Sequence, residues 1–363
     1  MNKLTELPFA SYHPGDEFLA FYRIFFSAFL LWIGISDNSW IHSIPNTAMQ
    51  PPISVLSFTE AIPSRAFFVI CQYLMYLCLL LILTGYRPRI FAILYMVLYI
   101  VTSNYAYSFG KVNHDFIYTL PILIIAFTPW NKTFSFFPEP EKETDESARS
   151  WPLFMISMIV SFGMFTAGIS KILGGWLSAD TQYTQIFFSQ YRYIIGWNGL
   201  LSDFYDQISS KVFWEILDDL TVIFETSFIV AFFYPKFFRL MLLLLVFFHL
   251  NVLLMLNISF MYSIGLYVLF IPAYLLPSGL KKKVKNILTY IFRPEHRGFA
   301  LVSVMLYLLV LVFFHINIIG FIVNELFSLV AFNQYSTSLI MLGGAFLFAL
   351  YLLMRSFRKA EMR

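Results

Sequence analysis

The chain has 363 residues, of which 59% are hydrophobic and 12% charged, with a formal net charge of +3. Soluble domains carry about 25% charged residues, and a soluble fold of this length has too little interior to hide so much apolar surface. The composition therefore predicts a membrane protein, and the small net charge argues against a nucleic-acid partner. With two cysteines only, Cys71 and Cys78, neither a disulfide framework nor a metal cluster is expected.

Apolar stretches long enough to cross a bilayer recur along the whole sequence. A spanning helix needs about 20 predominantly apolar residues. The fold class predicted from these stretches is all-α, a polytopic transmembrane helix bundle of about 9–10 spans. Ten spans are placed at 18–36, 66–85, 90–108, 115–130, 151–173, 212–234, 237–257, 260–278, 299–323 and 335–355. The fourth is short and ends in Thr-Pro-Trp, so a tilted or re-entrant segment is the alternative there.

The distribution of basic residues predicts the orientation in the membrane. Most of the 24 lysines and arginines fall in segments that are cytoplasmic if the N-terminus is cytoplasmic. We therefore expect a cell-membrane protein with both termini in the cytoplasm. The predicted parts are a cytoplasmic N-terminus (1–17), a transmembrane domain (18–280), a basic cytoplasmic linker (281–298) and a C-terminal transmembrane helix pair with a short tail (299–363). The longest outer segment, 174–210, is rich in aromatic residues, which is typical of a membrane interface or a cap over a cavity.

A single lysine, Lys171, lies near the outer end of the fifth predicted span, in the segment AGISKILGGW. A lysine that is desolvated there could act as a base near neutral pH. Gly163 and Gly168 would let a neighbouring helix come close to this span. The alternative is a structural one, in which the lysine side chain extends to the outer interface.

The sixth predicted span carries a stripe of acidic residues. Glu215, Asp218, Asp219 and Glu225 fall within one arc of a helix, and we expect that arc to face the bundle interior. Arg23, inside the first span, is the predicted partner of Glu225 in a structural ion pair, because an unpaired buried charge is very costly.

Three histidines lie at outer ends or in outer halves of spans. His114 follows Asn113 at the junction of the third and fourth spans, where a surface histidine is the plainer interpretation. His249 in FFHLN and His315 in FFHIN form an echo that suggests either an internal repeat or chance, and an interhelical hydrogen bond is the structural alternative for both. Because the polar residues gather near one face, we expect a site on the outer side of the membrane.

At these residues the chain resembles the horizontally transferred transmembrane (HTTM) family, which includes the vitamin K-dependent gamma-glutamyl carboxylase. The segment AGISKILGGW is similar to the family signature whose lysine, at Lys171 here, deprotonates the vitamin K hydroquinone. The segment VNHDFIYTLPILIIAFTPW resembles the stretch that brings a histidine to the site, and FFHLN resembles a later histidine-bearing span. The opening FYRIFF resembles the early arginine of the family, here Arg23. The resemblance covers roughly residues 15–280.

The resemblance implies a membrane enzyme that acts on a reduced quinone of the vitamin K or menaquinol type, with O2 and CO2 and without an inferred metal. The expected partners are membrane lipid, the quinol and an unknown peptide or small-molecule substrate. The large lumenal domain of the carboxylase has no counterpart here, so the resemblance implies quinol chemistry and leaves peptide carboxylation open. Together with the outer-face clustering it gives an expected site with catalytic Lys171, His114 and His249 and substrate-binding Asn113, Trp176, Glu215, Asp218 and His315.

Two other classes of function fit the same sequence. A non-catalytic membrane protein could bind a lipid or quinone, or act in the maturation of, or immunity to, a secreted peptide toxin. A transporter would require inverted repeats and broken helices near the midplane. An enzyme requires Lys171, His114 and His249 around a ligand-sized cavity, whereas a structural protein would fill that space with Phe and Leu.

Overall fold

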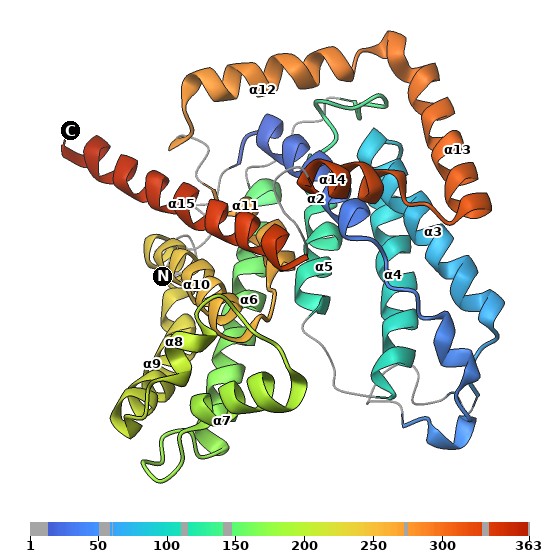
Figure 1. The fold of residues 1–363 in the computed structure, drawn as a ribbon. Coiled ribbons are helices and arrows are strands. Elements are labelled where there is room, and N and C mark those ends of the chain that lie inside the picture. Colours follow the sequence, from blue (N-terminus) through green and yellow to red (C-terminus); the bar gives the residue numbers. More distant parts are fainter. Residues whose placement is uncertain are drawn as a thin grey trace, which may run out of the picture. The chain divides into compact units, whose positions relative to one another are not determined.

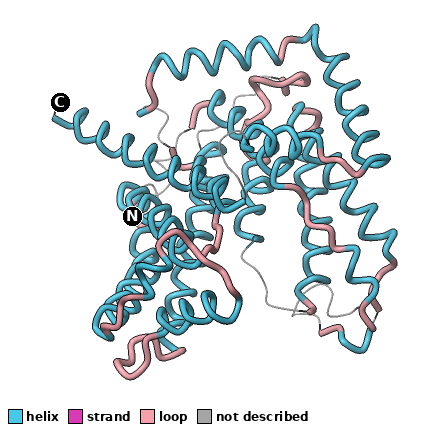
Figure 2. The backbone as a smooth tube through the Cα atoms, in the orientation of Figure 1, coloured by secondary structure: helices cyan, strands magenta, loops and turns pink. Residues whose placement is uncertain are grey.

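A computed structural model describes residues 14–50, 59, 61–109, 115–140, 147–271, 275–328 and 334–361. Within these ranges the regular secondary structure is helical and contains no strand, which confirms the predicted all-α class (Figures 1 and 2). The contacts divide the chain into two compact units. The Arg23 unit comprises Pro14–Pro152 and Leu276–Phe327, and the Lys171 unit comprises Leu153–Leu275 and Ser328–Arg363.

Six helices in the described part of the chain are long and apolar enough to cross a membrane. They are α3 (Arg65–Thr84), α4 (Pro88–Tyr107), α6 (Ser147–Leu173), α10 (Pro235–Leu256), α13 (Arg297–Phe314) and α15 (Gln334–Glu361). In α13 and α15 only 17% of the apolar stretch is buried within the protein, and Phe299 of α13 is 76% exposed. Lipid solvates such surfaces and water does not. The chain is therefore a multi-pass membrane protein.

The Arg23 unit is built around a tight helical hairpin of α3 and α4. Gly85 ends α3 with a φ of 83°, and the Tyr86 N–H donates to the Leu81 carbonyl at 2.9 Å, the pairing that commonly closes a helix C-terminus. Pro88 then starts α4 at a position where a missing N–H costs nothing. The other described helices of this unit are the long α13 and the elements α2 (Asp16–Ile33), η1 (Ser39–Ser43), η2 (Asn46–Ala48), α5 (Asp115–Ile125), α12 (Ser278–Ile291), η7 (Pro294–His296) and α14 (Ile318–Ser328).

The Lys171 unit contains the long helices α6, α10 and α15 together with α9 (Lys211–Ala231). Ser210 caps α9 by accepting a hydrogen bond from the Phe213 N–H at 3.3 Å. The C-terminus of α10 is capped by Asn257, which has a φ of 57°. The shorter elements of this unit are α7 (Tyr183–Ser189), a π-helix (Gln190–Ile195), α8 (Ser202–Asp206), η5 (Met261–Ser263) and α11 (Ile264–Leu269).

Several predicted spans differ from the observed helices. In the span expected at 260–278, the helical residues among those described belong to η5, to α11, which ends at Leu269, and to the first residue of α12, Ser278. The span expected at 299–323 is divided, because α13 ends at Phe314 and the side chain of Asn317 accepts a hydrogen bond from the Gly320 N–H at 2.9 Å, starting α14. Apolar composition extends across both interruptions, so hydropathy alone does not detect them.

We predict that Gly85→Val destabilises the protein. Valine tolerates positive φ poorly, and a Cβ at this position would lie 2.0 Å from Ser135 Oγ, so the expected loss is about 2–4 kcal/mol. The midpoint of thermal aggregation in detergent measures it. Gly344→Ala in α15 is the matched control, because a Cβ there meets open space. Equal midpoints for the two variants would contradict the prediction.

Candidate functional site

Gly168 brings helix α6 into close contact with helix α9. A Cβ at Gly168 would lie 2.7 Å from Thr226 Cγ2 and 3.2 Å from Glu225 Cβ. Residues three apart on a helix share a face, so Lys171, one turn after Gly168, is directed toward α9 as well. Gly168, which the sequence predicted at a helix contact, therefore lets the Lys171 side chain approach α9.

Lys171 forms an ion pair with Glu225. The Nζ donates to Glu225 Oε2 at 2.5 Å, and the two side chains are 23% and 6% exposed. The Nζ also lies 5.3 Å from the centroid of the Trp176 ring. Lys171 is therefore not an isolated amine, because its Nζ has an acidic partner and an aromatic neighbour. Its role as a base stays a prediction.

The predicted ion pair between Arg23 and Glu225 is wrong, because each group has another partner. Glu225 pairs with Lys171, and the fully buried Arg23 donates to backbone carbonyls. These carbonyls lie at the end of α3 and after α5. They are those of Ile82 (2.5 Å), Leu83 (2.9 Å), Trp130 (3.3 Å) and Phe134 (2.5 Å). The guanidinium thus joins two carbonyls of the α3 C-terminus, where a helix lacks intrahelical donors, to two carbonyls of the chain after α5.

Asp218 and Glu215 of α9 hold the start of α7. The carboxylate of Asp218 is 0% exposed and accepts hydrogen bonds from the N–H groups of Tyr183 (2.7 Å) and Thr184 (2.8 Å). Glu215 Oε2 accepts from Gln182 Nε2 at 3.2 Å. A carboxylate at a helix N-terminus is favourable because it pairs unsatisfied N–H groups. Both residues position the start of α7, and the substrate-binding role expected for them stays a prediction.

The anchored α7 in turn completes the surroundings of Lys171. Tyr183, the first residue of α7, stacks on Trp176 with ring centroids 5.5 Å apart and an interplanar angle of 6°. Gly175, with a φ of 86°, makes the turn after α6, and the Trp176 N–H donates to the Lys171 carbonyl at 3.1 Å. The structure therefore brings together Lys171 and Trp176, as the sequence suggested, and adds Glu225 and Tyr183.

His249 is buried within the same unit and is hydrogen-bonded there. Its Nδ1 lies 2.6 Å from Tyr267 Oη and 3.2 Å from Ser263 Oγ, and its ring stacks on Phe260 at 4.2 Å between centroids. This arrangement matches the hydrogen-bonded alternative stated for His249. Both hydrogen bonds involve Nδ1, so a catalytic hydrogen bond from His249 would have to come from Nε2.

The other predicted site residues fall elsewhere. His315 belongs to the Arg23 unit, is exposed, and contacts Tyr73 Oη through its Nδ1 at 3.0 Å. It has a φ of 56° beyond the end of α13, whereas His249 lies inside α10, so the FFHxN echo does not correspond to a structural repeat. Asn113 and His114 lie outside the described residues, and their approach to Lys171 stays a prediction.

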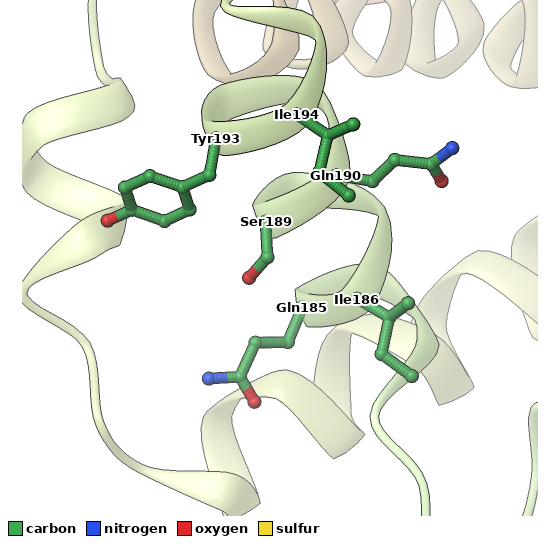
Figure 3. Close-up of a pocket in the computed structure, with 6 residues that line it drawn as sticks. All are labelled: Gln185, Ile186, Ser189, Gln190, Tyr193 and Ile194. Carbon is green, nitrogen blue, oxygen red and sulfur yellow. The ribbon is translucent and has the colours of Figure 1, made fainter.

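A surface hollow of about 520 Å³ lies on α7 and the π-helix (Figure 3). It is open to the outside and is lined by Gln185, Ile186, Ser189, Gln190, Tyr193 and Ile194. On the same π-helix, Arg192 donates to Asp203 at 2.7 Å, and the hydrogen bond from Tyr193 to Asp206 raises the pKa of the Tyr193 phenol. This hollow does not include Lys171, so it is not the expected cavity around the lysine. Among the described residues, no group of three or more His, Cys, Asp or Glu side chains could hold a metal ion.

Comparisons of this chain with protein-family models, with curated proteins and with solved structures found no match. The resemblance to the HTTM family therefore rests on the sequence motifs around Lys171, His114 and His249. The geometry of the site has to be judged on its own chemistry.

We predict that Arg23→Lys destabilises the protein, because one ammonium cannot replace a planar fork that reaches four carbonyls. Buried carbonyls left without donors should cost at least about 2 kcal/mol. Thermal stability in detergent measures the loss. The control is Arg65→Lys at the exposed start of α3. The same small loss in both variants would show that the carbonyl cluster is not what Arg23 stabilises.

We also predict that Asp218→Asn loosens α7. The amide keeps the shape but replaces one acceptor by a donor that faces a backbone N–H, at a cost of roughly 1.5–3 kcal/mol. Limited chymotrypsin digestion should cut residues 174–210 faster in this variant than in the unmodified protein. Asp219→Asn, on the next and partly exposed residue of α9, should leave the digestion rate unchanged. Unaltered cleavage in Asp218→Asn would contradict the anchoring role.

Proposed function

We propose that this protein lies in the cell membrane with both termini in the cytoplasm, binds a reduced quinone beside Lys171, and catalyses its oxidation or epoxidation. The observation that carries the proposal is the Lys171–Glu225 ion pair next to Trp176. The family resemblance supplies the quinol, of vitamin K or menaquinol type, and adds O2 and CO2 as co-substrates.

The ion pair supports proton transfer at this position. The Lys171 side chain is 23% exposed and accessible to a ligand, whereas the Glu225 side chain is 6% exposed. In surroundings of low polarity, the charged pair and the neutral amine–acid pair come closer in free energy than they are in water. Transfer of the Lys171 proton to Glu225 Oε2 across 2.5 Å leaves an amine that can accept a phenolic proton.

The aromatic residues of the site fit a quinol ring. Trp176 and Tyr183 are stacked nearly parallel beside the Lys171 Nζ, and such a pair offers a flat apolar surface with aromatic edges for another ring. Lys171 would take the hydroquinone proton, and Trp176 would hold the ring against it. His114 and His249 would donate hydrogen bonds to the developing oxyanion.

We predict that Lys171→Ala abolishes turnover of quinol and that Lys171→Arg separates binding from catalysis. Arginine keeps the positive charge beside Glu225 but does not lose its proton in proteins. It should therefore retain quinol binding while turnover falls about 10²–10⁴-fold. The measurement is product mass spectrometry after aerobic and anaerobic incubation of the protein in nanodiscs with reduced menaquinone, vitamin K or ubiquinone.

Lys211→Ala, on the exposed first residue of α9, is the control and should turn over quinol normally. Unchanged turnover in Lys171→Arg and Lys171→Ala would end the catalytic proposal. A second candidate function is non-catalytic binding of quinone or lipid, which is favoured by the hydrogen-bonded state of His249. It predicts binding that depends on Lys171 with no product from any of the quinols.

A further inference from the structure

Helix α12 has a basic face and an apolar face, and both are largely accessible, with Val284 and Leu288 only partly covered by the protein. None of its residues is buried. The apolar residues recur at the spacing of one helix face, and among them Leu280, Ile287 and Ile291 are 45%, 48% and 44% exposed. The opposite face and the flanks carry four exposed lysines, which are Lys281, Lys282, Lys283 and Lys285.

The position of α12 is fixed at its C-terminal end. The ring of Phe292, the residue after α12, packs on Phe136 with centroids 4.8 Å apart. Arg297 donates to the Phe136 carbonyl at 2.8 Å and lies 5.0 Å from the Phe137 ring centroid. Nearer its middle, Lys285 forms a 2.5 Å ion pair with Glu17 at the start of α2. The helix is thus held in place while its apolar face stays largely accessible.

The chain continues from α12 directly into a helix of membrane-spanning length. Only the short η7 turn (Pro294–His296) separates α12 from α13, and the chain turns sharply there (Figure 1). Since the apolar stretch of α13 is 17% buried, lipid must surround it. A helix that joins the end of such a span at a steep angle lies at the level of the lipid headgroups.

We propose that α12 lies on the membrane surface and binds anionic phospholipids. Its apolar face enters the boundary between headgroups and acyl chains, and its lysines contact the phosphate groups. A basic amphipathic helix at the interface is stabilised by burial of its apolar face and by electrostatic attraction to the headgroups. Anionic lipids supply the negative charge that attracts the exposed lysines. Lysine side chains flanking the apolar face can extend their stems over lipid and keep the ammonium groups among the headgroups.

The test places nitroxide labels on the two faces of α12 in the full chain in nanodiscs. Labels are attached after Ile287→Cys, on the apolar face, or Thr289→Cys, on the opposite face, in a Cys71→Ala/Cys78→Ala background. Nanodiscs contain phosphatidylcholine alone or mixed with phosphatidylglycerol. With phosphatidylglycerol, the label at position 287 should collide more with O2 and less with a water-soluble nickel complex than the label at position 289.

Replacing Lys281, Lys282 and Lys283 by glutamine is the second variant. It keeps the Lys285–Glu17 ion pair, and α12 has no buried residue whose packing the change could disturb. Each lysine should strengthen binding to an anionic surface about fivefold, so in this variant the label at position 287 should return to water. Equal nickel accessibility of both labels with phosphatidylglycerol would overturn the proposal. Insertion that is the same in both lipids and independent of the lysines would overturn the anionic preference.

Discussion

The ion pair between Lys171 and Glu225 is the contact on which the Lys171 unit depends. Removing a charge from water costs roughly several kcal/mol even after a protein has relaxed around it, and Glu225 is nearly inaccessible. That cost is offset only if a cation pairs with the Glu225 carboxylate. Gly168 allows Lys171 to do so, because it lets α6 approach α9. The placement of Trp176 and Tyr183 then follows from the turn after α6 and from the carboxylate of Asp218.

The Arg23 unit meets the same constraint with backbone acceptors in place of an acid. Arg23 is fully buried, and its guanidinium donates to four carbonyls at the end of α3 and beyond α5. In an apolar environment a polar group must find its partner inside the protein. The two units differ in the acceptor that the cation uses, which is a set of backbone carbonyls for Arg23 and the carboxylate of Glu225 for Lys171.

The sequence predicted the fold class and some of the site, for reasons that are local. Hydropathy identifies apolar helices, and helical periodicity correctly predicted that Asp218 and Glu225 of α9 face the interior, where both are buried. The proximity of Lys171 and Trp176 follows from their short separation along the chain. The partner of Glu225 was predicted to be Arg23 and is Lys171. The need to neutralise a buried charge predicts that a cation is present, but it does not identify the helix that carries it. The role of Asp218 depends on N–H groups 34 and 35 residues away, which no local pattern reveals, and the approach of His114 stays a prediction.

A double-mutant cycle on Lys171 and Glu225 tests whether the two side chains stabilise the protein as an ion pair. The unfolding free energy of the protein in detergent is compared for Lys171→Met, Glu225→Met and the double variant. We expect each single variant to be destabilised by the charge left behind, and the double variant to recover part of the loss, with a coupling of about 1–3 kcal/mol. Single effects that add to within about 0.5 kcal/mol would show that the two side chains do not interact.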